Sequence, residues 1–185
     1  MTELFSEGDA VLFMKIGTHA NEDLAAIIAR KQREIDEAGL SMWGYGGNTC
    51  HPTTMVQPFA RAHAAEGRPI VLCMQPMTSR HFADPVRAEE YSVDGIIWNA
   101  VPEAINVLGS RYALCVRRLR DVDGSLPLAD TRVAVGNSRG RVGTEYIKGH
   151  VDKACLEVVS HTGADSVEIG FIADVVEPYA VFLRN

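Results

Sequence analysis

The chain has 185 residues, 46% of them hydrophobic and 23% charged, a composition typical of a globular protein and not of a disordered or membrane-spanning one. Its net charge of −6 disfavours tight, non-specific binding of nucleic acid, which depends mainly on Lys and Arg. Four scattered cysteines without a C-x-x-C motif, and an N-terminus without the basic region of a signal peptide, predict a reduced, cytoplasmic protein.

The beginning of the chain predicts a buried strand followed by an amphipathic helix. Residues 10–17 are almost entirely apolar, as expected of a buried strand. In the following segment apolar residues recur at helical spacing, and Lys31 is the one charged residue in that stripe. Asn21 is the expected N-cap of this helix, and Gly39 is suited to its C-terminal cap.

Two more strands and a second helix are predicted before residue 77. Residues 40–47 resemble a strand that runs into a glycine-rich loop, and residues 57–66 resemble a helix. Pro58 is tolerated only in the first turn of a helix, so this one should begin near residues 54–57. A third buried strand follows and should stop at Pro76. Connections of this kind usually make neighbouring strands parallel.

The second half of the chain has the character of antiparallel β structure. Turns are expected at Asp94–Gly95 and Asp123–Gly124, a short helix after residue 145, and a strand break at Pro178. The predicted fold class is therefore α+β. A β-α-β-α-β front half, about residues 1–77, joins a mostly antiparallel β back half, about residues 78–185, in one compact domain spanning 1–185.

The stretch WGYGGNTCHPTT, residues 43–54, is the first candidate site. Its glycines let a ligand approach the main chain, its threonines offer hydroxyl donors, and successive amides ahead of a helix can bind an anion. Trp43 and Tyr45 are suited to stacking on a flat ring. The stretch lacks lysine and matches no G-x-G-x-x-G or G-x-x-x-x-G-K-[ST] fingerprint. A tight connection with Trp43 packed in the core is the alternative interpretation.

Other polar residues follow the predicted strands of the front half. If these strands are parallel neighbours, their carboxyl ends meet at one edge of the sheet, where ligand sites form in such folds. We therefore predict binding of an anionic or nucleotide-like small ligand at this edge. The predicted ligand-binding residues are His19, Trp43, Tyr45, Gly46, Gly47, Asn48, Thr49, Cys50, His51, Thr53, Thr54, Arg80 and His81.

The sequence assigns neither a catalytic residue nor a cofactor. Cys50 and His51 are adjacent, and adjacent side chains seldom point at each other, so Cys50 is predicted to line the site and not to act as a nucleophile. The sequence has neither H-E-x-x-H nor a close Cys/His cluster, so no metal site is predicted. Any reaction should be hydrolysis or group transfer, because no dinucleotide fingerprint indicates redox chemistry.

Two alternatives come from other classes of protein. Residues 111–148 hold eight basic and four acidic residues, which would suit a nucleic-acid-binding module. The aliphatic run at residues 175–183 would suit a structural or assembly subunit that forms a homo-oligomer through an edge strand or a buried patch. The arginines of the nucleic-acid alternative are Arg117, Arg118, Arg120, Arg139 and Arg141.

Overall fold

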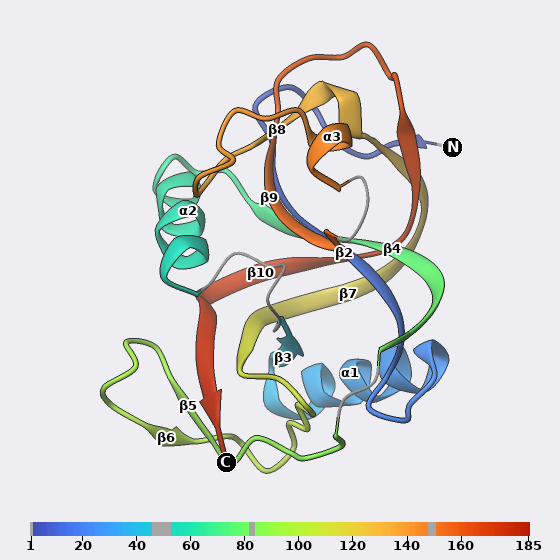
Figure 1. Ribbon diagram of the computed structural model, residues 1–185. Coiled ribbons are helices and arrows are strands. Elements are labelled where there is room, and N and C mark those ends of the chain that lie inside the picture. Colours follow the sequence, from blue (N-terminus) through green and yellow to red (C-terminus); the bar gives the residue numbers. More distant parts are fainter. Residues whose placement is uncertain (1, 46–52, 82–83, 148–150) are drawn as a thin grey trace.

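The elements of the fold are arranged around one mixed sheet with mostly antiparallel strands (Figure 1). The computed structural model describes residues 2–45, 53–81, 84–147 and 151–185. Helices make up 22% and strands 46%, which confirms the predicted α+β class. In chain order the elements are β1 (Thr2–Glu3), β2 (Ala10–His19), α1 (Leu24–Ala38), β3 (Ser41–Gly44), α2 (Thr53–Ala65), β4 (Ile70–His81), β5 (Glu90–Ser92), β6 (Asn99–Ala100), β7 (Tyr112–Pro127), η1 (Leu128–Asp130), β8 (Thr131–Val133), α3 (Gly143–Ile147), β9 (Lys153–Val158) and β10 (Ser166–Arg184).

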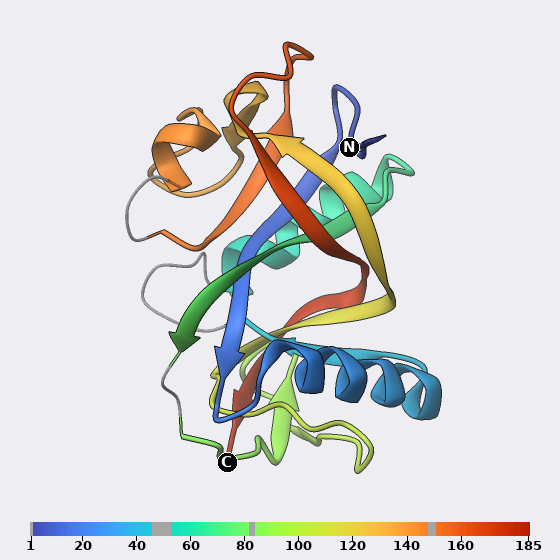
Figure 2. The same ribbon diagram turned by 90° about the vertical axis from the view of Figure 1, so that its right-hand side faces the viewer.

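Two long strands, β7 and β10, hold the sheet together. They pair antiparallel, with the largest register shift between Val175 and Ala180 of β10, and both bend (Figures 1 and 2). On one side of the bend the strand order is β1-β7-β10-β4-β2-β9-β8. On the other side, β3 pairs with β7 and β5 pairs with β10. The bend therefore divides the sheet into two portions that face a shared core.

β2 and β4 are parallel neighbours, as the front half of the sequence predicts. Their register runs from Ala10–Ile70 to Ile16–Pro76 and resumes at Thr18–Arg80, so β4 has three residues opposite Gly17. The expected stop at Pro76 is wrong, because β4 continues to His81. Pro76 lies beyond Met74, the last residue of β4 that pairs with β10, so its missing N–H costs no bond on that side.

β3 does not join β2 and β4, which corrects the expectation of neighbouring parallel strands. It pairs antiparallel with the first residues of β7, from Ser41–Val116 to Gly44–Ala113. Met42 packs in the cluster around Ile105, whereas Trp43 packs in the main core. A strand with apolar side chains on both faces must be buried on both faces. Pairing with the first half of β7 places β3 between the main core and the cluster around Ile105.

The caps of α1 are partly those predicted. Gly39 ends the helix with a φ of 83°, and its N–H bonds the carbonyl of Ile35 at 2.9 Å, as expected. The N-cap is Asp23, whose carboxylate accepts from the N–H of Ala26 at 2.8 Å. Asn21, the expected cap, instead lies in the turn after β2 with a φ of 65°.

Three boundaries differ from the sequence predictions because tertiary packing continues an element past a local break. α2 begins at Thr53, so Pro58 lies inside it, and its apolar face packs into the main core. Gly124 lies within β7 and not in a turn; a side chain there would meet Leu4 at 2.5 Å. Pro178 lies within β10, after a cis peptide bond.

The back half confirms the turn at Asp94–Gly95. There one carboxylate oxygen of Asp94 accepts from the N–H groups of Ile96 and Ile97, at 2.8 and 2.9 Å. The run at residues 175–183 belongs to β10, which pairs with β7 on one side and, on the other, with β4 up to Val175 and with β5 from Phe182. Within the described residues, no helix has the length and apolar character that a membrane crossing needs.

Candidate functional site

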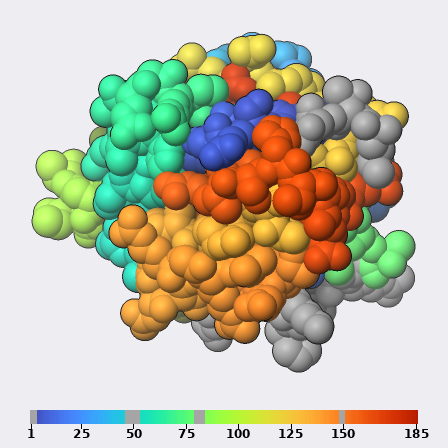
Figure 3. Space-filling view, turned by 90° about the horizontal axis from the view of Figure 1, so that it is seen from above, coloured from blue at the N-terminus to red at the C-terminus, as the bar shows by residue number. Residues whose placement is uncertain are grey.

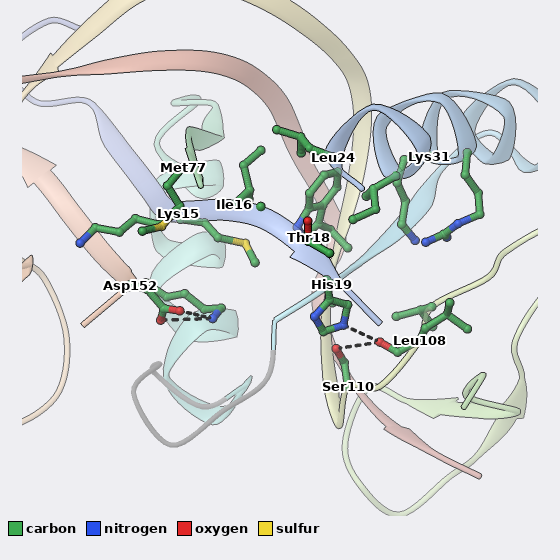
Figure 4. Close-up of a pocket in the computed structure, with 18 residues that line it drawn as sticks. Lys15, Ile16, Thr18, His19, Leu24, Lys31, Met77, Leu108, Ser110 and Asp152 are labelled. Atoms are coloured by element: carbon green, nitrogen blue, oxygen red, sulfur yellow. Dashed lines mark hydrogen bonds and ion pairs between the residues drawn. The ribbon is translucent and has the colours of Figure 1, made fainter. Parts of the chain in front are cut away.

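A cavity of about 90 Å³ opens where the carboxyl-terminal end of β2 meets the first half of α1 (Figure 4). Residues of β3, of β4, of the segment before β7 and of the start of β9 complete its wall. The apolar part of the wall includes Met14, Ile16, Leu24, Trp43, Met77 and Val107. The polar part includes Lys15, His19, Arg30, Lys31, Ser110 and the pair Asp152 and Lys153.

The close approach of β3 to the segment before β7 shapes one side of this cavity. A Cβ atom on Gly44 would lie 2.4 Å from Oγ of Ser110, so only glycine fits here without a shift. Trp43 is 5% exposed and packs in the main core while also lining the cavity. The sequence left open whether Trp43 packs in the core or stacks on a ligand. The structure places its side chain in the core and at the wall of the cavity.

The carboxylate of Glu34 anchors a buried polar network behind the cavity. Its Oε1 accepts from Nη1 of Arg30 at 2.8 Å and from the backbone N–H of Asn106 at 3.0 Å. Its Oε2 accepts from Nζ of Lys31 at 3.0 Å and from Oγ of Ser41 at 2.5 Å. With two donors on each oxygen, Glu34 is saturated, and it ties α1 to β3 and to the segment before β7.

The two cations of this network are both paired with carboxylates. Lys31 Nζ donates to Glu34, to the carbonyl of Met42 at 2.6 Å and to the carbonyl of Asn106 at 3.3 Å, which uses all three of its N–H groups. Burial lowers the pKa of Lys31 to about 8. Arg30 contacts both oxygens of Glu22, and this hydrogen bonding lowers the pKa of that carboxyl. The charges of both cations are therefore compensated by Glu22 and Glu34.

A second group of charges, Lys15, Asp152 and Lys153, lies at the other end of the cavity. Figure 4 shows Lys15 and Asp152 on the side opposite Lys31, with His19 between them. Lys153 is 3% exposed, and its Nζ lies 3.2 Å from each carboxylate oxygen of Asp152. The half-buried Lys15 side chain forms no hydrogen bond or ion pair with any residue that the structure describes. Asp152 offsets the charge of Lys153, so the charge of Lys15 remains available to a ligand at this end of the cavity.

His19 is held in the middle of the cavity by two sets of contacts. Its backbone exchanges hydrogen bonds with Glu22, at 3.0 and 2.9 Å, in the turn after β2. Its Nε2 lies 3.0 Å from the carbonyl oxygen of Leu108, which also accepts from Ser110 Oγ at 3.3 Å (Figure 4). A carbonyl only accepts, so Nε2 carries the hydrogen.

The structure brings together only part of the predicted site. His19 and Trp43 line the cavity, and the backbones of Arg80 and His81 pair with Thr18 and His19 at the same edge. Tyr45 and Thr53 are each 1% exposed and lie in the interior, whereas Thr54 is exposed on α2. The predicted residues Gly46, Gly47, Asn48, Thr49, Cys50 and His51 lie outside the described residues.

Sequence reasoning missed the lysines of the cavity. The chain has only four, and three of them, Lys15, Lys31 and Lys153, line it. Lys31 was visible as the charge in an apolar stripe. Lys15 and Lys153 lie in different parts of the sequence, and only the pairing of β2 with β9 brings them close, through the register Met14–Lys153.

The arginines of the nucleic-acid alternative fall into two groups. Arg118 and Arg120 lie on β7, and each contacts Asp174 at 3.2 Å. Arg139 and Arg141 belong to the loop between β8 and α3. The orange surface of this part of the chain faces the viewer in Figure 3. In the strand order, β10, β4, β2 and β9 separate β7 from β8, so strand pairing does not join the groups.

Metal-binding and thiol chemistry find little support in the described part of the chain. Among those residues, His, Cys, Asp and Glu form no group of three or more that could hold a metal ion. Cys73 and Cys115 are buried thiols, and burial raises the pKa of Cys115 to about 12. Such thiols act as small apolar side chains and not as nucleophiles.

Comparisons with models of protein families, with curated proteins and with solved structures found no match for this chain. The cavity and its charges are therefore the basis on which a function can be proposed.

Proposed function

We propose that this protein binds a small anionic ligand in the cavity between β2, α1 and β3. The observation that carries the proposal is that three of four lysines of a chain with net charge −6 line one cavity. Glu22 and Glu34 neutralise Arg30 and Lys31, and Asp152 offsets Lys153. Lys15 is left over, so the cavity has a positive balance within an acidic molecule, which favours an anion.

The apolar wall favours a ligand with a flat or aliphatic body. Trp43, Met77 and Leu24 offer contact to such a body, and small-molecule sites typically combine an apolar wall with a few polar groups. Gly44, the first glycine of the 44–54 stretch, also lines the cavity. The anions that we propose include phosphorylated and nucleotide-like ligands.

If the bound ligand reacts, hydrolysis or group transfer remains the chemistry that we propose. His19 lines the cavity, with its ring held by the carbonyl of Leu108, and histidine is the side chain that most often serves as a general acid or base. Ser110 lies beside it and donates to the same carbonyl. A partner that would activate Ser110 as a nucleophile is not among its described contacts, so binding is the primary proposal.

The test is a thermal-shift screen with inorganic phosphate, small carboxylates and nucleoside monophosphates. A ligand that binds only the folded protein raises its melting temperature. We expect at least one anion to raise it, and Lys153→Met to reduce that rise. The control is Arg33→Met, which removes one positive charge from the exposed face of α1. An equal loss in both variants would mean that only overall charge matters and would contradict a site at the cavity.

A further inference from the structure

The two buried lysines of the cavity differ in how fully their ammonium groups are bound. Each is 3% exposed. Lys31 donates to three separate acceptors, which uses all three of its N–H groups. Lys153 contacts only Asp152, its neighbour in the sequence, at 3.2 Å from both oxygens, and meets no further partner in the described chain. A buried ammonium with donor capacity to spare favours a third acceptor, and a ligand anion supplies one.

The two ends of the cavity differ in the charge that they offer to a ligand. Lys15 and the Asp152–Lys153 pair lie at one end, and Lys31 lies at the other (Figure 4). At the Lys31 end, Glu22 and Glu34 already compensate the charges of Arg30 and Lys31. An anionic group is therefore stabilised at the Lys153 end, whereas a second anionic group at the Lys31 end would meet only cations that are already paired with carboxylates.

The size of the cavity restricts the ligand further. Pockets that bury drug-sized ligands measure roughly 300–1,000 Å³. The cavity, at about 90 Å³, is much smaller and therefore suits a compact molecule. A complete nucleotide, with base, sugar and phosphate, would extend outside.

We infer that the ligand is a compact amphipathic anion, with one carboxylate or phosphate held by Lys153 and Lys15 and an uncharged apolar body against Trp43 and Met77. This inference rests on the proposed function and narrows it from small anions in general. The inference predicts that two related kinds of molecule bind poorly: a dianion charged at both ends, and an uncharged molecule of the same shape. The carboxylate and the phosphate share this chemistry, and probes of each kind distinguish them.

The experiment titrates four probes and follows the fluorescence of Trp43. The chain has two tryptophans, and Trp98 lies under Arg184 in the β5–β6 hairpin region, so Trp98→Phe leaves Trp43 as the reporter. The probes are benzoate, phenyl phosphate, the uncharged benzamide and the dianion terephthalate. We expect saturable binding of benzoate or phenyl phosphate, with benzamide and terephthalate each about tenfold weaker or more. Benzamide or terephthalate binding as tightly would overturn the inference.

Variants connect the binding to the lysines. Lys153→Met should weaken the better probe about tenfold, whereas Arg33→Met should leave its affinity within about twofold. If Lys153→Met does not fold, as judged by circular dichroism, the half-buried Lys15→Met takes its place with the same expectation. Unchanged affinity in the folded variant would overturn the inference.

Binding of adenosine monophosphate but of neither compact anion would reject the compact ligand and leave the proposed function standing. Binding of no anion would reject both.

Discussion

Buried carboxylates in this protein are saturated by hydrogen bonds. Glu34 accepts four donors, and Asp130, which is 1% exposed, accepts from Ser160 Oγ at 2.7 Å, Thr162 Oγ1 at 2.6 Å and the N–H of Gly163 at 2.7 Å. Burial opposes ionisation of Asp130, but these hydrogen bonds outweigh it and hold its pKa below the usual range. Such groups organise the chain locally, so burial of charge alone does not identify a functional residue here.

Lys31 provides a prediction about pH and stability. Its pKa is about 8 in the folded protein and 10.5 ordinarily, so between these values the unfolded chain binds more protons. Stability therefore rises as the pH increases from 8 to 10.5, by about 3 kcal/mol from this residue alone. We expect the free energy of unfolding of the wild type to rise over this range relative to that of Lys31→Met, measured by urea denaturation. Parallel curves for the two proteins would contradict it.

At the scale of elements, β3 joins the cavity wall to the buried polar network of α1. β3 is four residues long and unites Trp43 with Gly44 at the wall, while Ser41 and the carbonyl of Met42 bind the network of α1. The four-residue strand is thus fixed by polar contacts on one side and by pairing with β7 on the other. The close approach at Gly44 is the most sensitive point of this arrangement.

Gly44→Ala tests that approach. The new Cβ would lie 2.4 Å from Oγ and 3.2 Å from Cβ of Ser110, so we expect a loss of stability of about 1–3 kcal/mol in denaturant unfolding. The double variant Gly44→Ala with Ser110→Ala removes the shorter contact and should recover most of the loss. A double variant as unstable as the single one would show that the contact with Ser110 is not the cause.

Local signals in the sequence predicted some elements well and others poorly. The apolar stripe of α1 and its terminal Gly39 are local features, and both were predicted correctly. The turn expected at Asp123–Gly124 is wrong because Gly124 pairs with Ile169 of β10. At Pro178 β10 continues as one strand, but its pairing with β7 is interrupted there, in the register shift between Val175 and Ala180. Long-range pairing outweighs a local turn preference when both faces of a strand are covered.

At the scale of the whole molecule, the cavity is a product of chain topology. Its wall draws on residues 14–19 of β2, 24–31 of α1, 43–44 of β3, 107–110, and 152–153 next to β9. Only the parallel pairing of β2 with β4 could be predicted from the sequence, and it indicated the edge of the sheet at which His19 lines the cavity. The contributions of β9 and of the segment before β7 depend on antiparallel pairings that no local pattern specifies.

The most direct test of ligand binding at this cavity uses methionine methyl groups as reporters in NMR spectra. Met14 and Met77 line the cavity, whereas Met55 lies 38% exposed on α2 and does not. In a protein carrying ¹³C-labelled methionine methyls, titration with benzoate or phenyl phosphate should shift Met14 and Met77 along one saturable curve and leave Met55 unmoved. Absence of a saturable shift at Met14 and Met77, or an equal shift at Met55, would contradict a ligand site in this cavity.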